Sequence, residues 1–286
     1  MATPYSDYEA IYSQMFAATF ESEYQAVGRL GNVLAPAHKY MNVNDNKVNV
    51  PQSTPIDMVP LTSFQADLAS LNTTVRNKEI SFEQRYVKQT VGRMELPQFH
   101  PNAINMIINQ QAKALQRYED SKIINALNAS GNTPISAPSN MTTEIFTKAR
   151  AQLGKNNVTG NLYMLMHWNN FEALLGDTQF TSNLFNKEMP LNNPGVSAVQ
   201  FLDFTILRFG DVLDAQTGEN IGLPLNSGVR TCFAFSDTSL IFGSQVEAMP
   251  EVTYVPQNLR YEIVTASSLG ASVYDAKGIV PISCTE

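Results

Sequence analysis

The strongest constraint on this chain of 286 residues is one long stretch of helical periodicity in its first half. Pro101 suits the start of a helix, because its fixed φ and missing N–H cost nothing in the first turn. The helix is expected to end at about Asn128, with Gly131 just beyond it. About 27 residues give roughly 40 Å of helix, enough for a spine along which other elements pack. Its apolar stripe comprises Ile104, Ile107, Ile108, Ala112, Leu115, Tyr118 and Ile123.

An extended excursion is predicted before this helix. Residues 36–71 carry little helical pattern, and within them residues 47–50 predict a short strand. Regular helix and central strand are then blocked by three prolines, because proline lacks the backbone donor that both need. These prolines are Pro51, Pro55 and Pro60.

A second extended run covers residues 75–91. Residues of one parity are apolar in the middle of this run and charged toward its ends, which predicts one face that lies on protein and tips that do not. The apolar members are Ile80, Phe82 and Tyr86, and the charged members are Arg76, Lys78 and Lys88. We interpret the two runs as an antiparallel excursion projecting from the body. Because an isolated two-stranded hairpin is marginal in water, such a projection needs a partner surface.

The first segment, residues 8–30, predicts an amphipathic helix. Its apolar stripe covers either its own domain or a neighbouring subunit. Ile11, Met15, Phe16, Ala18 and Phe20 fall near helical spacing, and Gly28 and Gly31 punctuate the end. Asp7, Glu9 and the lack of a basic stretch at the start lead us to expect no secretory signal.

The rest of the chain is expected to alternate helices and strands, without an internal repeat or a linker long enough to separate independent domains. Thr142 or Thr143 is expected to cap a helix through Leu153, with Glu144 in its favourable first turn. The other predicted elements are a buried strand at 162–167, a helix opened by Asn169 and Asn170, strands at 199–209 and 229–235, an apolar run at 239–242, paired strands at 251–254 and 260–267, and a final segment at 271–282.

Composition favours a surface that other protein covers. Charged residues make up 16% of the chain, against roughly a quarter in a typical domain. Neutral Asn, Ser, Thr and Gln replace them, and amides cost less to desolvate than charges. A plain soluble protein with a polar surface fits the same composition. The net charge of -7 and the absence of a Lys/Arg cluster argue against a nucleic-acid reader, although an acidic subunit can still enclose nucleic acid.

Chemical motifs are sparse. The three histidines, His38, His100 and His167, have no second ligand at metal-binding spacing, so a structural role is expected for each. No nucleophile elbow, dinucleotide fingerprint or phosphate loop occurs. We therefore expect no catalytic residue, cofactor or metal, although a hydrolase whose site assembles from distant residues stays an alternative.

Two further groups are expected to be structural. Glu119 and Asp120 are flanked by Arg117 and Lys122 and are expected on a solvated helix face with local salt pairs. Cys232 lies in an apolar strand and is expected to be a small buried hydrophobe, and with Cys284 it predicts neither a disulfide framework nor a zinc site. No apolar run approaches the roughly 20 residues of a membrane span, so no membrane partner is expected.

The order of these elements resembles the major capsid proteins of tailed bacteriophages with the HK97-type fold. Residues 22–30 resemble the arm helix, 75–91 the return strand of the extended loop, 103–128 the spine helix and 270–280 the terminal strands. The resemblance implies an α+β fold with an N-terminal arm, an extended β-hairpin loop, a long spine helix and an α/β axial domain. The implied divisions are 1–35 for the arm, 36–95 for the loop and return strand, 96–140 for the spine helix and peripheral domain, 141–256 mainly for the axial domain, and 257–286 for returning peripheral strands.

The resemblance also implies a function. Copies of the chain would form hexamers and pentamers that close into an icosahedral shell around double-stranded DNA, in a virion made in the host cytoplasm. Scaffold, portal and decoration proteins are implied partners; an arm that follows Met1 directly favours a separate scaffold, or none. The lysine–asparagine cross-link of the namesake is not carried over, since the residues single out no reacting pair.

Candidate residues for contacts between subunits lie in the arm and the loop: Phe16, Phe20, Lys47, Phe64, Arg76, Lys78, Arg85 and Lys88. Two alternatives stay open beside the capsid. One keeps the fold in an encapsulin-like shell that holds a cargo protein. The other is a different virion component, such as a tail-tube or fibre subunit, which would form rods or rings.

Overall fold

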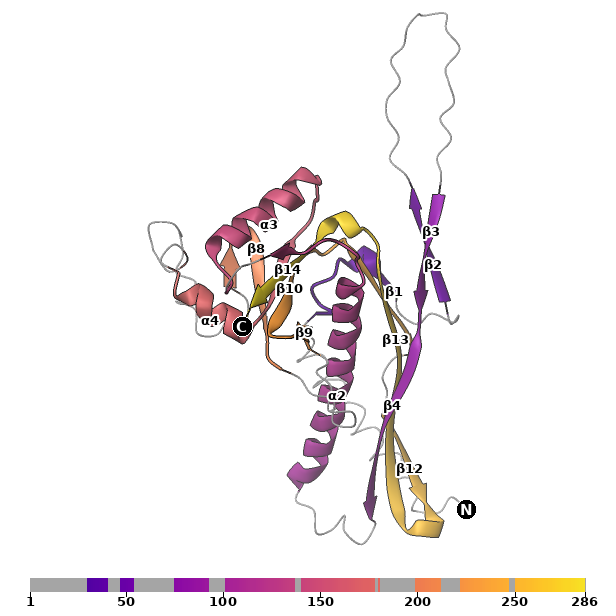
Figure 1. Cartoon of the computed structure of the whole chain (residues 1–286). Coiled ribbons are helices and arrows are strands. Elements are labelled where there is room, and N and C mark those ends of the chain that lie inside the picture. The colour runs from indigo at the N-terminus through magenta and orange to yellow at the C-terminus, as the bar shows by residue number, and fades with distance from the viewer. Residues whose placement is uncertain are drawn as a thin grey trace, which may run out of the picture.

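A computed structural model of the chain describes residues 30–40, 47–53, 75–92, 101–136, 140–177, 180, 199–211, 222–246 and 250–285. One long helix, α2 (Pro101–Asn128), lies at the centre between two sheets, and a two-stranded hairpin projects from the body (Figure 1). The mixture of few helices and many strands confirms the predicted α+β class. The predicted arm, residues 8–30, lies almost wholly outside the described residues.

Helix α2 has the predicted bounds. Ala112, Leu115, Tyr118 and Ile123 of the predicted stripe are buried, and Ile107 is partly buried. The side chains of Ile104 and Ile108 lie outside the described set. Gly131 follows the helix at φ 71°, a left-handed conformation that glycine adopts without strain.

One sheet has five strands. Its order is β1 (Lys39–Tyr40), β11 (Leu240–Val246), β13 (Arg260–Val273) and β12 (Pro250–Val255), with β4 (Glu83–Gly92) also paired to β13. The pairing predicted for 251–254 with 260–267 is confirmed by the register Tyr254↔Tyr261. Ile263 and Leu269 of β13 point into the core that contains α2, so the opposite face of this sheet is turned away from the helix.

The second sheet has seven strands. Its path is β5 (Ile135–Ser136), β14 (Ile279–Thr285), β10 (Val229–Ser236), β6 (Leu162–His167), β8 (Phe204–Phe209) and β7 (Val199–Phe201), and β9 (Leu225–Asn226) pairs with β10. The strand predicted at 162–167 is confirmed. The single strand predicted at 199–209 is wrong, because Leu202 and Asp203 take φ values of 47° and 67° and turn the chain between β7 and β8.

Two helices, α3 (Thr143–Lys155) and α4 (Trp168–Leu175), pack on this second sheet (Figure 1). Thr142 holds the N-cap position of α3, one of the two residues predicted for it, but its side chain makes no capping bond. Asp177 caps the helix instead: its Oδ2 accepts from Thr143 N at 3.0 Å and from Thr143 Oγ1 at 2.5 Å. Helix α4 starts one residue before Asn169, and His167 caps it.

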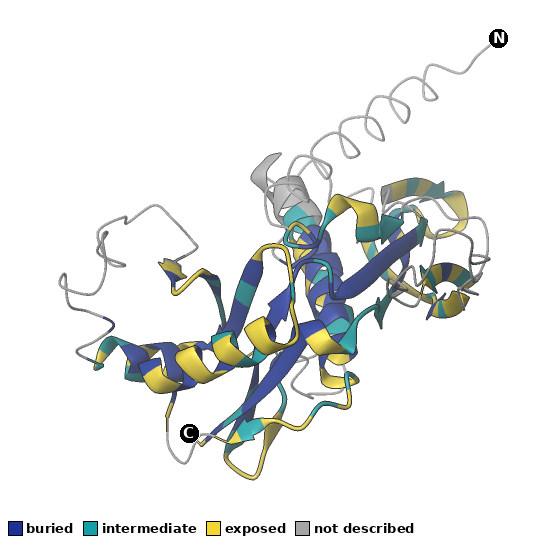
Figure 2. Ribbon diagram, turned by 90° about the horizontal axis from the view of Figure 1, so that it is seen from above, coloured by how far each residue is buried: buried dark blue, intermediate teal, exposed yellow. Residues whose placement is uncertain are grey.

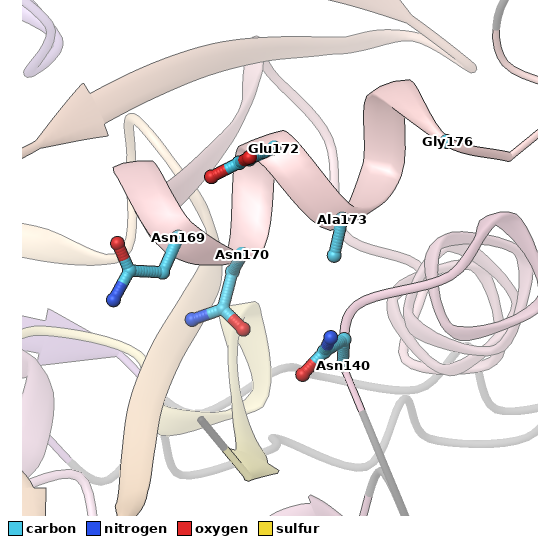
Figure 3. A pocket seen from close by; sticks show the side chains of 6 residues that line it. All are labelled: Asn140, Asn169, Asn170, Glu172, Ala173 and Gly176. Atoms are coloured by element: carbon cyan, nitrogen blue, oxygen red, sulfur yellow. The ribbon is translucent and has the colours of Figure 1, made fainter.

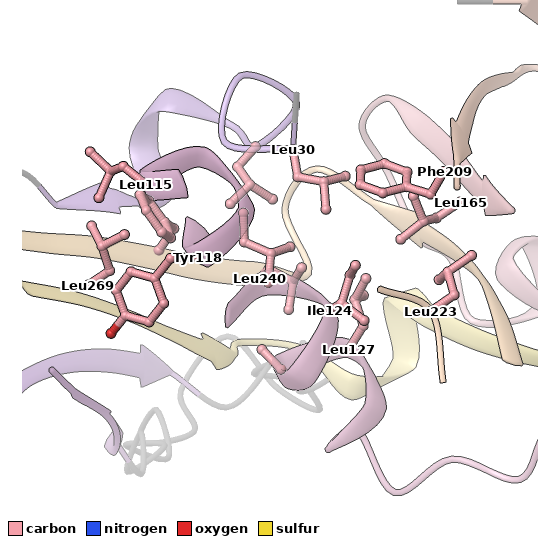
Figure 4. Close-up of a cluster of buried hydrophobic side chains, with 14 of the residues drawn as sticks. Leu30, Leu115, Tyr118, Ile124, Leu127, Leu165, Phe209, Leu223, Leu240 and Leu269 are labelled. Atoms are coloured by element: carbon pink, nitrogen blue, oxygen red, sulfur yellow. The ribbon is translucent and has the colours of Figure 1, made fainter. Parts of the chain in front are cut away.

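Two apolar cores result, one on each face of the seven-stranded sheet. The first lies around α2, where Leu115, Tyr118 and Leu127 meet residues of both sheets (Figure 4). The second lies under α3 and α4 and contains Phe146. Figure 2 shows the buried strands between exposed helix faces. Cys232 and Cys284 are fully buried residues of the second core, and Cys232 is buried in its strand as predicted.

The carboxylates of Glu119 and Asp120 contradict the prediction of a solvated helix face. They are only 7% and 8% exposed. Asp120 Oδ1 accepts from the backbone N–H of Leu30 at 3.3 Å, and the Glu119 carboxylate lies against Gly31. Both therefore hold the start of the described chain against α2, a tertiary contact that local charge spacing does not reveal.

The projecting hairpin consists of β2 (Lys47–Ser53) and β3 (Val75–Ser81), which form a sheet of their own. Strand β2 continues through Pro51, opposite Asn77, so the prediction that Pro51 ends the strand is wrong. A two-stranded sheet has only edge strands, where a missing N–H on the open side costs nothing. Short 3-10 turns complete the described chain: η1 (Pro36–His38), η2 (Pro256–Asn258) and η3 (Ala276–Gly278).

Candidate assembly interface

The β2–β3 hairpin is anchored at one end and open along the rest of its described length. Val50 and Ile80 are buried, at 6% and 0% exposure, and pack against Ile241 of β11. The other described side chains of both strands are exposed or half-buried. Figure 1 shows the hairpin extending beyond the body from this base. Two strands with so few buried side chains are marginal on their own, so the hairpin offers surface to a partner.

Three of the predicted contact residues lie on the hairpin. Lys47 forms an ion pair with Glu79 across the two strands, Nζ to Oε1 2.5 Å, and stays 65% exposed. Arg76 is exposed and Lys78 is half-buried. The described hairpin therefore presents three positive side chains and one carboxylate, Glu79, on an otherwise uncharged ribbon. Phe16, Phe20 and Phe64 lie outside the described residues.

The other two predicted contact residues, Arg85 and Lys88, lie on opposite faces of β4. Arg85 faces helix α2 of the same subunit. Its Nε lies 2.9 Å from Glu83 Oε1, and its guanidinium lies 5.0 Å from the ring centroid of Tyr118. Lys88 is on the face turned away from α2 and pairs with Glu262 of β13 at 2.6 Å. The structure does not bring the two residues together.

A cluster that the sequence did not reveal fixes the start of β4 to the long helix. We call Glu83, Arg85, Tyr118 and Lys122 the β4 latch. Lys122 donates to the Glu83 carboxylate, and the Tyr118 hydroxyl donates to the Glu83 carbonyl at 2.8 Å. The four-residue spacing of Tyr118 and Lys122 puts them on one helix face, but no local signal points to Glu83 as their partner.

The latch shifts two pKa values. The hydrogen bond from Lys122, helped by Arg85, lowers the pKa of Glu83 below its usual 4.5. Burial, and then the charge of Glu83, raises the pKa of Tyr118 to about 12. The Tyr118 hydroxyl therefore stays a donor at all physiological pH values.

Glu83→Gln is expected to lower the free energy of unfolding by about 0.5–1 kcal/mol at pH 7, the upper range for an ion pair that is partly open to solvent. A lowered folded-state pKa means that the stabilisation is present above about pH 4.5 and disappears as the pH falls through the folded value. Urea titrations at pH 7 and pH 3.5 measure this. Glu144→Gln, which breaks the exposed Glu144–Lys148 pair, is the control and should cost less. Equal losses for Glu83→Gln at both pH values would contradict the latch.

Neutral amides join α2 to the five-stranded sheet on the N-terminal side of the latch. Gln111 accepts from Thr265 Oγ1 at 2.8 Å and donates to Gln89 Oε1 at 3.2 Å and to the Ile263 carbonyl at 3.4 Å. Gln89 in turn donates to Gln110 at 3.3 Å. Because these amides pair with each other, few hydrogen-bond donors and acceptors stay unsatisfied. The network holds the helix to the sheet without a charged side chain among its members.

The face of the sheet turned away from α2 carries exposed side chains on β4, away from the base of the hairpin. Tyr86 of β4 is 73% exposed there, beside Ala266 of β13. The Lys88–Glu262–Arg260 ion pairs lie on the same face, with Arg260 Nη2 2.7 Å from Glu262. A large exposed tyrosine among paired charges is typical of an interface surface.

The described part of the chain offers little for catalysis. A polar pocket beside α4 has one carboxylate, Glu172, among amides and small residues (Figure 3). Its lining is Asn140, Asn169, Asn170, Glu172, Ala173 and Gly176. Within the described ranges no three His, Cys, Asp or Glu side chains gather as metal ligands. Nor does any described helix have the length and apolar character needed to cross a membrane.

The described histidines have structural contacts. His167 Nδ1 accepts from the Asn169 N–H at 3.3 Å and so caps α4. Its Nε2 lies 3.6 Å from Asp211, which also pairs with the buried Arg230 at 2.9 Å. The His38 ring packs edge-on against Tyr274, with centroids 4.9 Å apart. His100 lies outside the described residues.

Comparison with known proteins agrees with this arrangement. A family model described as phage capsid protein matches residues 9–286. The chain belongs to the phage capsid protein family. No curated protein matches this capsid protein. Its fold is similar to that of solved capsids, and the low identities mean that these matches speak for the fold alone.

Three solved structures illustrate the likeness. The capsid of cyanophage P-SCSP1u has a TM-score of 0.70 at 12% identity, over 91% of this chain and 89% of that chain. The chain from Mycobacterium phage Che8 has a TM-score of 0.64 at 12% identity, over 89% and 90%. A virus-like particle from Pyrococcus furiosus has a TM-score of 0.61 at 12% identity, over 95% and 99%.

The family and the fold together establish the role of this capsid protein. It is a structural major capsid protein of the HK97-type fold, as the resemblance predicted, and it assembles with copies of itself into the capsid shell of a virion. The encapsulin-like alternative is not better supported, since the TM-score of the Pyrococcus particle, 0.61, does not exceed that of the cyanophage capsid, 0.70.

Proposed function

We propose that this capsid protein forms hexamers and pentamers, closes into an icosahedral shell around double-stranded DNA, and uses the β2–β3 hairpin as the connector between neighbouring subunits. One observation carries the connector: the hairpin leaves the body with Val50 and Ile80 as its buried anchors and the rest of its described surface open. A neighbouring subunit is the surface that makes such a hairpin stable.

The contact we propose is heterologous, with the hairpin of one subunit lying on the body of the next. Repetition of such a contact closes rings, and rings close a shell. Each contact needs only about −4 kcal/mol, a millimolar affinity, because many act together in the closed object. Lys47, Arg76, Lys78 and Lys88 are the described candidates for this contact. Arg85 is a further candidate, since its side chain stays 56% exposed although it pairs with Glu83 in the latch.

Our proposal for the contents rests on the resemblance to the capsids of tailed phages, and the net charge is compatible with it. A subunit with a net charge of -7 gains no strong attraction to phosphates, so the shell holds its genome without reading its sequence. We extend the proposal to scaffold, portal and decoration proteins as partners, to synthesis in the host cytoplasm, and to the domain divisions at residues 35, 95, 140 and 256.

A shortened hairpin tests the connector. Residues 51–77 are replaced by an Asn-Gly turn, which joins Val50 to its register partner Lys78 and keeps both buried anchors. We expect a folded subunit whose yield of closed shells falls at least tenfold. Negative-stain electron microscopy and sedimentation velocity of the purified protein measure this yield.

A matched control keeps the hairpin and alters its chemistry in one place. Glu79→Gln breaks the exposed Lys47–Glu79 pair without shortening either strand and should leave shells of normal size. If the shortened variant also builds normal shells, the hairpin is not the connector. Extraction of nucleic acid and protein from wild-type particles distinguishes a DNA-filled capsid from a cargo shell, and rods or open rings would contradict both.

A further inference from the structure

The way in which β3 leaves the body depends on two glycines. Strand β4 runs beside β13 as far as the register pair Glu83↔Leu269. At the next residue, Phe82, the chain breaks out of the ladder. Ser81 and Ile80 then lie over Gly270 on the face turned away from α2, where Ile80 reaches Ile241. The hairpin therefore crosses above the sheet and does not continue along its edge.

The sheet has no side chains at the crossing point. Gly243 of β11 and Gly270 of β13 are register partners, directly opposite each other. A Cβ added to Gly270 would lie 2.5 Å from the Ser81 carbonyl oxygen and 2.8 Å from Ile80 Cγ2. A Cβ added to Gly243 would lie 2.8 Å from Phe82 Cε1. All three separations are shorter than ordinary van der Waals contacts, so this crossing requires glycine at position 270 and, with Phe82 in place, at position 243.

We propose that this pair, the glycine seat, is the positioning element that sets the direction in which the β2–β3 hairpin leaves the body. Its consequence for assembly rests on the proposed function, in which the hairpin must meet a neighbouring subunit. Both glycines act through Ile80, Ser81 and Phe82, which lie against them.

The geometry amplifies a small change at the seat. The Ser81 carbonyl oxygen would lie 2.5 Å from a Cβ at position 270, and moving it to an ordinary contact distance requires a shift of about 1 Å. Across the roughly 5 Å between paired glycines, this shift is a tilt of about 10°. Strand β3 has seven residues at about 3.3 Å each, so its far end moves by about 4 Å. A displacement of this size breaks the register of a side-chain contact on another subunit.

The two glycines differ in what they support, and this difference gives the test its specificity. Gly270 faces the backbone of Ser81, which cannot be removed, whereas Gly243 faces the far end of the Phe82 ring. Leucine at position 82 lacks the Cε1 and Cζ atoms that a methyl group at position 243 would meet. Phe82→Leu should therefore relieve Gly243→Ala and leave Gly270→Ala unrelieved.

The experiment measures the hairpin direction in the full-length unassembled subunit by pulsed electron spin resonance. Labels go on the exposed Ser53→Cys of β2 and Lys113→Cys of α2, while the native Cys232 and Cys284 are fully buried and stay unlabelled. For Gly270→Ala we expect a shift of about 4 Å in the mean label distance, and an at least tenfold loss of shells in the protein without labels.

The variants of Gly243 complete the set. Gly243→Ala should shift the distance in the same way, and adding Phe82→Leu should restore both the wild-type distance and the shell yield. Gly154→Ala in α3 is the control, because its nearest side-chain atom is 3.8 Å away, and it should change neither readout. Circular dichroism confirms folding; if Gly270→Ala does not fold, the Gly243 and Phe82 variants still carry the test.

An unchanged distance in both single glycine variants overturns the seat. Rescue of Gly270→Ala by Phe82→Leu also overturns it, because the ring and not the backbone contact would then set the direction. Failure of the proposed function looks different: the hairpin-shortened protein assembles normally, while the distance shift of Gly270→Ala persists and still supports the seat.

Discussion

Phe146→Ala is expected to lower the free energy of unfolding by about 3–5 kcal/mol, the largest stability loss of any substitution considered for this protein. Phe146 is a fully buried residue of α3, and its ring lies edge-on to the rings of Phe201 and Phe204, with centroids 5.6 Å and 6.0 Å away. Removing the ring leaves a cavity at the point where α3 meets β7 and β8, and the two partner rings lose their edge contacts.

Urea unfolding followed by tryptophan fluorescence measures this loss. Trp168 is the only tryptophan in the chain and lies on α4 with its ring 5.9 Å from Phe171, so it reports on the same core. Leu225→Ala is the matched control, because Leu225 is 44% exposed and its truncation should change stability by about 0.5 kcal/mol or less. A loss below 1 kcal/mol for Phe146→Ala would show that α3 is not packed as described.

Ile80→Ala is expected to detach the hairpin base from the body. Ile80 is 0% exposed and packs with Val50 against Ile241, and truncation of such a side chain costs about 2–4 kcal/mol. Because few other apolar contacts hold the base, we expect local release of the hairpin more than global unfolding. Shell yield should fall at least tenfold, and a protease should cut within the hairpin much faster than in the wild type.

The control for Ile80→Ala lies on the same strand. Val75 is 59% exposed, so Val75→Ala removes apolar atoms without touching the anchor and should change stability by about 0.5 kcal/mol or less. Limited proteolysis with electron microscopy of both variants gives the comparison. Wild-type cleavage rates and shell yield in Ile80→Ala would mean that the anchor does not hold the hairpin.

Much of the fold was predictable where local pattern and tertiary context agree. The periodicity of 101–128 predicted the bounds of α2, because most of its described stripe residues are buried, and the continuous apolar run of 162–167 predicted β6, which is buried at every residue except the half-buried Tyr163. The projecting hairpin was predicted from the prolines after residue 50 and from the alternation in residues 75–91. The structure divides that run at Phe82 into β3 and β4, and Tyr86, which was predicted on the face that lies on protein, is 73% exposed.

The remaining features depend on contacts that sequence spacing does not encode. Asp177 caps α3 from 34 positions away, and Glu119 is buried because the turn at Gly31 lies on it. The turn at Leu202 and Asp203 lacks glycine, which is the usual signal for positive φ. The seat at Gly243 and Gly270 joins strands whose pairing was not predicted, so the meaning of these glycines emerged only from the three-dimensional arrangement.

Cryo-electron microscopy of particles assembled from the full-length protein tests the central claim most directly. We expect closed shells in which the β2–β3 hairpin of each subunit lies across the body of a neighbour, with Ile80 still packed on β11 of its own subunit. A hairpin folded back along its own subunit, or a purified protein that stays monomeric under assembly conditions, would contradict it.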